Sequence, residues 1–149
     1  MKNITLTLLS IFLCLLFSKG YSQQIGVTGN LNGISDVSAN SPATTNWTDY
    51  QSATSRTFVI ENIQGGAPTT LNLTSITLSN TTNFTITTNP APIGLGKNVS
   101  TNLIIQLNTL TAGTYTSTVT IASDASNDGA DNVWTFTIRA VRAPEINLL

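Results

Sequence analysis

The residues best suited to chemistry form one short polar stretch, in which Asp124, Ser126 and Asp128 occupy alternate positions. Carboxylate and hydroxyl oxygens with this spacing match the first half of a calcium-binding loop, and Asn132 would add an amide oxygen. The twelfth position of such a loop needs an acid that binds through both oxygens, but Thr135 stands there. Asp, Asn and Ser are also the common residues of turns. The pattern therefore predicts either a calcium site or a solvated turn, and the missing acid favours the turn.

Two aromatic residues, Trp47 and Tyr50, lie in the otherwise polar stretch Ser38–Gln51. Aromatic rings exposed on a β-sandwich present an apolar face on which sugars stack, so both are candidates for carbohydrate contact. The alternative is that they cover a sheet. Trp134 shares its strand parity with Phe136, and we therefore expect it in the core.

The residue inventory excludes several classes of enzyme. The chain has no histidine, which rules out Ser-His-Asp and Cys-His catalysis and removes a common zinc ligand. Its single cysteine, Cys14, lies within an apolar run near the amino terminus. Glycoside hydrolysis needs two carboxylates that face each other across a cleft, whereas most acids here fall in expected loops or on solvated strand faces. The sequence predicts a protein that is not an enzyme.

The amino terminus has the features of a signal peptide. Lys2 precedes the apolar run Ile4–Phe17, and the small side chain of Ser22 suits cleavage before Gln23. As a helix this run would span ~21 Å, less than the ~30 Å of bilayer hydrocarbon. We expect residues 1–22 to be removed and the rest to be secreted or held at the cell surface without a membrane span. An uncleaved membrane anchor is the alternative.

The charge of the mature chain argues against nucleic acid as a partner. After removal of residues 1–22, four basic and seven acidic residues leave a net charge of −3. A nucleic-acid-binding protein would carry a basic patch, and these few cations form none.

The stretch Thr114–Val141 supplies the clearest structural pattern. Val119 and Ile121 alternate with threonines in its first half, and the same period of two returns with heavier side chains after residue 133. This alternation is typical of half-buried strands. Ser123–Asn132, between the halves, is rich in Asp and Asn, so we expect a hairpin with a long polar tip.

Similar alternation predicts further strands along the rest of the chain. They are Gln24–Thr28, Thr54–Asn62, Leu71–Ser79, Phe84–Ile86 and Val99–Leu107, with a brief edge strand at Ile34 and Val37. The buried parity changes across Thr74–Ser75, which predicts a β-bulge there. The count predicts an all-β fold, an immunoglobulin-like antiparallel β-sandwich of seven to eight strands over residues 23–143.

The end of the sequence is apolar, with Ile146, Leu148 and Leu149. Residues 144–149 are interpreted as a C-terminal edge strand or as the start of a further repeat. An apolar strand of this kind must pair with its own sheet or with another chain. We therefore expect these residues to form an interface with a protein partner or a neighbouring repeat domain.

The order of several strand motifs resembles the choice-of-anchor D group, Hydin-like and immunoglobulin-like domains of secreted bacterial proteins. The motifs are Thr57-Phe58-Val59-Ile60-Glu61-Asn62, then Asn83-Phe84-Thr85-Ile86, then Ala112-Gly113-Thr114-Tyr115, and the closing Ala143-Pro144-Glu145-Ile146. Tyr21-Ser22-Gln23-Gln24 is similar to the signal regions of exported Bacteroidetes proteins. The resemblance implies spacers, stalks or adhesive modules, and it carries over no catalytic residue.

These observations predict a non-catalytic, exported module with a structural or protein-interaction role. The alternative is an adhesin that depends on carbohydrate or calcium. Fold alone does not separate the two, because one sandwich architecture serves many functions.

Overall fold

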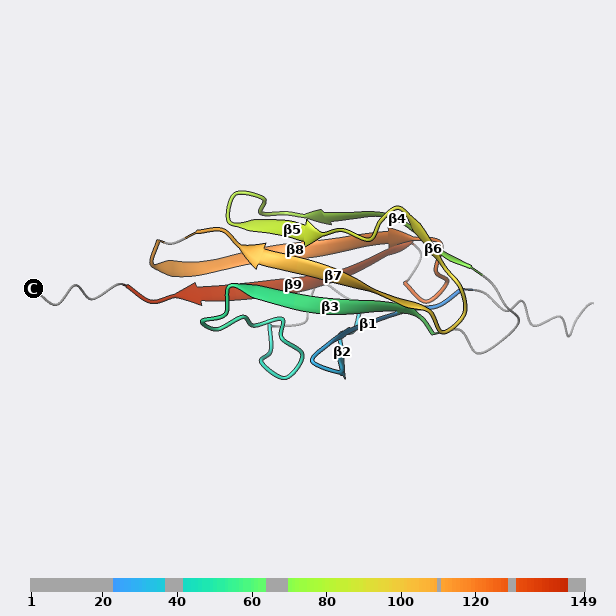
Figure 1. The fold of residues 1–149 in the computed structure, drawn as a ribbon, viewed down its shortest axis with the longest axis horizontal. Helices are drawn as coiled ribbons and strands as arrows, with labels where there is room; N and C mark the ends of the chain where they lie inside the picture. Colours follow the sequence, from blue (N-terminus) through green and yellow to red (C-terminus); the bar gives the residue numbers. More distant parts are fainter. Residues whose placement is uncertain (1–22, 37–41, 64–69, 110, 129–130, 145–149) are drawn as a thin grey trace, which may run out of the picture.

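The computed structural model describes residues 23–36, 42–63, 70–109, 111–128 and 131–144. These residues form two antiparallel sheets that pack face to face, with no helix among them, which confirms the predicted all-β sandwich (Figure 1). The predicted signal peptide, residues 1–22, lies outside the described residues. So do the predicted interface residues Ile146, Leu148 and Leu149.

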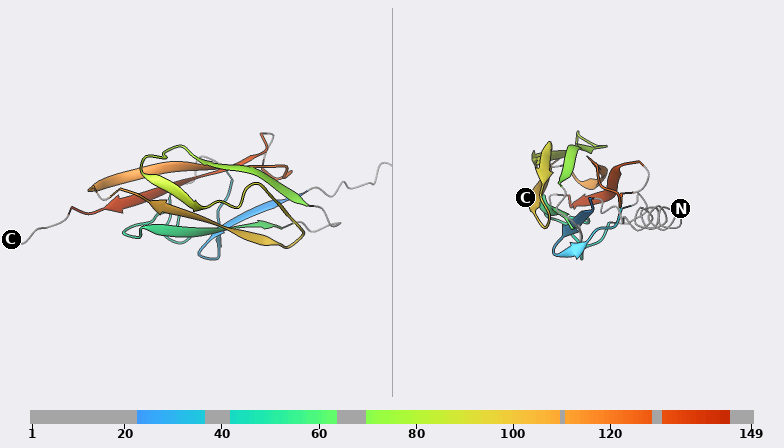
Figure 2. Two further views of the ribbon diagram at one scale, coloured as in Figure 1. Left: turned by 45° about the horizontal axis from the view of Figure 1, so that its top comes forward. Right: turned by 90° about the vertical axis from the view of Figure 1, so that its right-hand side faces the viewer.

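Nine strands make up the two layers. The first sheet contains β1 (Ile25–Gly29), β2 (Asn32–Gly33), β3 (Ser55–Asn62), β5 (Phe84–Thr88) and β7 (Ser100–Leu107), in the spatial order β2-β1-β3-β7-β5. The second contains β4 (Leu71–Leu78), β6 (Ile93–Leu95), β8 (Gly113–Ser123) and β9 (Val133–Arg142), in the order β6-β4-β8-β9. The chain changes sheet at each step from β3 to β8, so consecutive strands lie in opposite layers (Figure 2).

The predicted hairpin is present as β8 and β9. Val119 lies opposite Phe136, and Ile121 lies opposite Trp134. All four side chains are buried, because the period of two places them on the face that meets the other sheet. The prediction that Trp134 belongs to the core is confirmed.

The core is a layer of apolar side chains between the sheets. Phe58 of β3 packs against Phe136 of β9 with ring centroids 5.2 Å apart and an interplanar angle of 61°. Such edge-to-face contacts add to the free energy gained from apolar burial. Other fully buried members come from both sheets, namely Ile25, Ile60, Leu71, Leu103, Ile105 and Ile138.

The bulge predicted in the fourth strand is confirmed. Leu73 pairs with Ser123 and Ser75 pairs with Ala122, which leaves Thr74 as an extra residue in β4. Leu73 and Ile76 differ in parity, yet both are buried, because the bulge returns the strand to the register that the core requires.

Two short strands differ from the prediction, and the second of them brings the count to nine. The edge strand β2 lies at Asn32–Gly33, before Ile34, whose N–H continues the pairing by donating to the Val27 carbonyl at 2.8 Å. Val37 lies outside the described residues. The other is β6, Ile93–Leu95, which is not among the predicted strands; it pairs with Leu71–Leu73.

The outer edge of β9, which pairs with no described strand of its own sheet, is covered by the connection that precedes β3. Arg139 donates its backbone N–H to the carbonyl of Thr48 at 2.8 Å, and Tyr50 donates to the carbonyl of Arg139 at 2.7 Å. Val141 donates to Gln51 at 3.1 Å. Because these bonds satisfy backbone groups that would otherwise face solvent, the Thr48–Gln51 segment blocks pairing with another strand at this edge.

The opposite side of the sandwich is less protected. β5 is the last strand of its sheet, and β6 pairs only with Leu71–Leu73 of β4. Among the described residues no strand covers Ile76–Leu78 on that side.

The molecule is elongated along its strands. The chain enters β1 at one end of the long axis and leaves β9 at the other, as Figure 1 shows. At about 3.3 Å per residue, the 11 residues of β8 span roughly 36 Å.

Candidate functional site

The stretch considered as a calcium loop forms the tip of the β8–β9 hairpin. The Asp124 carboxylate accepts hydrogen bonds from the backbone N–H of Asn72 at 2.8 Å and from its side-chain amide at 2.6 Å. Ser126 donates its N–H and its hydroxyl to the carbonyl of Gln23, at 2.8 and 3.0 Å. These two side chains are therefore engaged with different parts of the sandwich.

Asp128 lies inside the tip, with 0% of its surface exposed. Its Oδ2 accepts a hydrogen bond from the Ser123 hydroxyl at 2.9 Å, while its Oδ1 has no hydrogen-bond partner among the described residues. Burial raises the pKa of the Asp128 carboxyl above its ordinary value, and the negative charges of Asp36 and Asp131 act in the same direction. The carboxyl is thus held in surroundings that favour its protonated form.

The last candidate calcium ligand, Asn132, also has its own local role. Asn132 has a left-handed backbone, with φ of 56°, and its carbonyl accepts a hydrogen bond from the N–H of Ser123 at 3.1 Å. Within the described ranges, no group of three or more acidic, histidine or cysteine side chains could hold a metal ion. The arrangement resembles the turn alternative, and calcium binding stays a prediction.

Asn127, which the sequence did not single out, attaches this tip to the first strand. Its Oδ1 accepts a hydrogen bond from the N–H of Ile25, and its Nδ2 donates to the carbonyl of Ile25, both at 2.8 Å. The side-chain amide therefore pairs with the strand as a neighbouring backbone would. No local pattern marks this role, because 102 positions separate the two residues.

Tyr50, a candidate for carbohydrate contact, is fully buried. Its ring meets Phe84 edge to face, with centroids 5.9 Å apart and an interplanar angle of 80°. Its hydroxyl donates to the carbonyl of Ile105 at 3.1 Å. Burial raises the pKa of the Tyr50 hydroxyl well above its ordinary value. The ring is therefore a core side chain supplied by a loop, and it is not open to a sugar.

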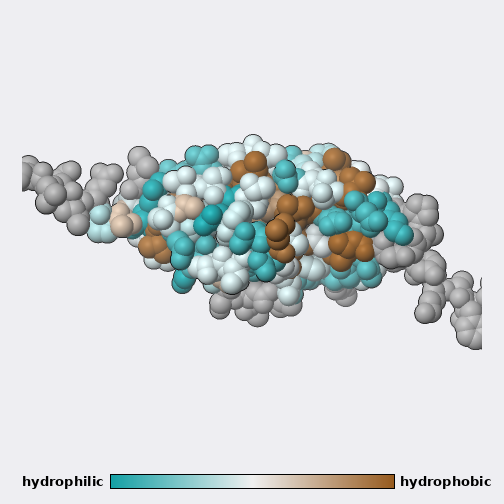
Figure 3. Space-filling view, turned by 60° about the horizontal axis from the view of Figure 1, so that its bottom comes forward, coloured by the Kyte–Doolittle hydropathy of each residue, from teal (hydrophilic) through white to brown (hydrophobic). Residues whose placement is uncertain are grey.

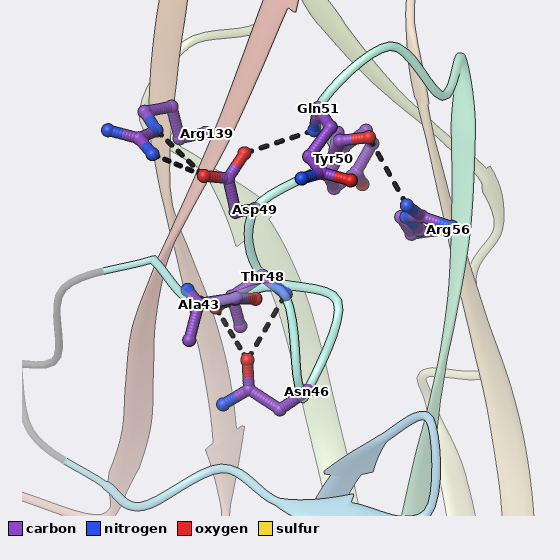
Figure 4. Close-up of polar contacts among 8 residues, drawn as sticks. All are labelled: Ala43, Asn46, Thr48, Asp49, Tyr50, Gln51, Arg56 and Arg139. Atoms are coloured by element: carbon purple, nitrogen blue, oxygen red, sulfur yellow. Dashed lines mark hydrogen bonds and ion pairs between the residues drawn. The ribbon is translucent and has the colours of Figure 1, made fainter.

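Trp47 is partly exposed, in contrast to Tyr50. The guanidinium carbon of Arg56 lies 5.0 Å from the centroid of the Trp47 ring, a distance typical of cation–π contact. Arg56 also donates from Nη2 to the carbonyl of Tyr50 at 3.2 Å (Figure 4). Carbohydrate contact at Trp47 stays a prediction, with one side of the ring already faced by a cation.

An ion pair joins the edge-covering segment to β9. The Asp49 carboxylate accepts from Nε of Arg139 at 3.2 Å and also from its Nη2, and its other oxygen accepts from the N–H of Gln51 at 3.0 Å (Figure 4). Burial alone would raise the pKa of Asp49, but the hydrogen bonds from Arg139 and Gln51 and the positive charge hold it below its ordinary value. These groups line a shallow cleft of about 510 Å³, which also includes Val141.

The β1–β2 hairpin presents an unusual apolar tip. Asn30 and Leu31, its two turn residues, have φ values of 50° and 62°, as in a type I′ turn. Glycine is the usual second residue of that turn, since a left-handed conformation costs other residues roughly 1–2 kcal/mol. Leu31 is nevertheless 97% exposed. Asn30 and Asn32 both donate side-chain amide hydrogens to the carbonyl of Thr45, at 3.2 and 2.8 Å, which fixes the tip.

An apolar cleft opens between β4 and β5, on the less protected side. Its volume is about 430 Å³. Four apolar and three hydroxyl-bearing residues line it, namely Ile76, Leu78, Phe84, Ile86, Thr77, Thr81 and Thr85. None of them carries a charge. Strand alternation is enough to predict that Ile76 and Phe84 are buried. It does not predict the cleft, which depends on how the two sheets meet.

The surface around the β1–β2 hairpin shows no single large apolar area. In Figure 3 hydrophobic residues form separate small patches among hydrophilic ones. The exposed large hydrophobic residues of the described chain are Leu31, Ile63, Ile93, Val99 and Val141.

The described part of the chain contains no helix with the length and apolar character needed to cross a membrane. No model of a known protein family matches the chain, and a search of curated proteins finds no match either.

Proposed function

We propose that the protein is an exported, non-catalytic β-sandwich module that spaces proteins or contacts them at or outside the cell surface. The observation that carries this proposal is geometric. The described chain enters and leaves at opposite ends of the long axis, so whatever adjoins each end is held apart by the length of the strands (Figure 1).

The packing supports a spacer role because it makes the module stiff. Strands from both sheets run along the long axis, and a continuous apolar core joins them. The edge-covering segment Thr48–Gln51 and the Asn127 amide fasten the loops to this core. A module of this kind resists bending because its interior is close-packed.

The outer strand faces fit a structural role better than a reactive one. On β8 and β9 they carry Thr114, Thr116, Thr118, Thr120, Thr135 and Thr137. Threonine suits a solvated strand face, but without a nearby base it is a poor nucleophile. The order of strand motifs quoted above supports the finer assignment to choice-of-anchor D domains.

Export is tested by recovering the secreted protein and sequencing its amino terminus. The proposal expects a mature chain that begins at Gln23. A chain that keeps residues 1–22 and stays in the membrane would contradict export.

Spacing is tested by fluorescence energy transfer across the mature protein. Because Cys14 is the only cysteine and precedes Gln23, the variants Gln24→Cys and Ala143→Cys allow two dyes to be attached at opposite ends. The expected result is one narrow distance distribution. A Gly/Ser linker of equal length is the control, and it should give a broad distribution. A similarly broad distribution for the protein would refute rigid spacing.

Trp47 supports a second candidate, an adhesin that binds carbohydrate. Its ring is partly exposed, and its loop is fixed by the Thr48 hydroxyl, which donates to Oδ1 of Asn46 at 2.7 Å (Figure 4). A glycan array should then show a bound glycan that Trp47→Ala loses and Val141→Thr, an exposed control, retains. Absence of binding to any glycan would end this candidate.

A further inference from the structure

The apolar tip of the β1–β2 hairpin has no evident role within one molecule. Leu31 adopts a left-handed backbone and exposes 97% of its surface, so it contributes almost no burial to its own fold. Glycine would satisfy the same turn with less strain. The amides of Asn30 and Asn32 hold the tip against the carbonyl of Thr45. Leu31 is therefore a fixed apolar projection.

The β4–β5 cleft has complementary properties. It is lined by Ile76, Leu78, Phe84 and Ile86, with threonines around them and no charged side chain. The hairpin tip, Gly29–Gly33, also carries no charge. Contact between the two would bury apolar surface without removing any charge from water, which is the costly part of forming many interfaces.

The two features lie on opposite sides of the same molecule. β2 and β5 are the two edge strands of the five-stranded sheet, which has the order β2-β1-β3-β7-β5. β2 and β5 lie correspondingly far apart in Figure 1. Leu31 therefore cannot enter the cleft of its own chain, but the hairpin of one molecule can meet the cleft of another.

We propose that copies of this protein associate side by side through two different surfaces, with Leu31 of one copy seated in the β4–β5 cleft of the next. This deepens the proposed function, on which it rests, by naming the protein partner as a second copy. Because the hairpin and the cleft lie on opposite sides of the molecule, the contact does not close on itself as a two-fold dimer would, and a pair of copies keeps one free hairpin and one free cleft. Side-by-side rows are the expected product.

The contact is small, and its affinity should be low. A single hairpin tip buries much less than the ~1,200 Å² of a standard interface. We therefore expect association only at high concentration, or where copies are held close together on a surface.

Sedimentation velocity of the mature chain provides the test, at concentrations up to about 1 mM, because so small a contact binds weakly. The sedimentation coefficient should rise with concentration. Leu31→Gly should abolish the rise and leave the melting temperature unchanged or raised, because glycine relieves the left-handed strain. Thr81→Arg should abolish it by filling the cleft. Val141→Thr and Thr114→Arg, at exposed sites elsewhere, should leave the rise unchanged.

Mixing the two variants tests whether the contact is heterologous. Leu31→Gly keeps its cleft and Thr81→Arg keeps its hairpin, so an equimolar mixture should form one-to-one dimers and nothing larger. A wild-type chain that stays monomeric, a rise that survives Leu31→Gly, or a mixture that stays monomeric would each overturn the proposal. These outcomes would leave export and rigid spacing, which are measured on the monomer, unaffected.

Discussion

Tyr50 offers the sharpest test of how the loop before β3 is built. Its hydroxyl makes a buried hydrogen bond to Ile105, and its ring packs on Phe84. Tyr50→Phe leaves that buried carbonyl without its side-chain donor, and we expect a loss of about 1–2 kcal/mol in the free energy of unfolding. Tyr50→Ala also leaves a cavity, and a loss of about 3–5 kcal/mol should follow.

Urea unfolding of the chain from Gln23 onward measures both losses. With a slope of about 2 kcal/mol per molar urea, Tyr50→Phe should lower the midpoint by roughly 0.5–1 M. Tyr115→Phe is the matched control, because its hydroxyl also donates to a backbone carbonyl, that of Thr111 at 3.0 Å, but in an exposed setting. That change should cost less than about 0.5 kcal/mol. Equal effects at the two tyrosines would refute the core assignment of Tyr50.

Three further predictions concern the acidic residues. Asp49→Asn should cost about 1 kcal/mol at neutral pH, because its pairing with Arg139 lowers the pKa of Asp49 in the folded state; the difference between the unfolding curves should vanish as pH falls through that lowered pKa. Asp128→Asn should act in the opposite sense, because the folded state raises the pKa of Asp128. The variant should gain stability relative to wild type as pH rises from about 4 through the raised pKa. A stability difference that is constant with pH would contradict this. If the tip binds calcium, the ion should raise the melting temperature and EDTA should lower it, with Asp124→Asn weakening the response; a melting temperature that ignores both ends the calcium prediction.

The strand pattern was predictable wherever one face of a strand meets the core. Phe58 and Ile60 alternate with more polar neighbours, and both are buried as the period of two requires. The bulge at Thr74 was predictable for the same reason, since only an extra residue could bury both halves of β4. In these places local pattern and tertiary structure agree.

Features that depend on distant partners could not be read from the sequence. β6 has only Ile93 and Leu95 to mark it, and it is a strand because Leu71–Leu73 lies beside it. Tyr50 comes from a polar stretch, and only the space between the sheets determines that its ring enters the core. The exposure of Leu31 was likewise not predictable, because Leu31 stands in a turn position that glycine normally occupies.

The hydrogen bonds between the side-chain amide of Asn127 and the backbone of Ile25 also constrain when β1 can complete its pairing. Synthesis begins at the amino terminus, so β1 is made long before Asn127. The two are far apart because 102 positions lie between Ile25 and Asn127. Contacts so distant in sequence form late and slow the rate of folding. During synthesis the pairing of β1 therefore stays incomplete until Asn127 has been made.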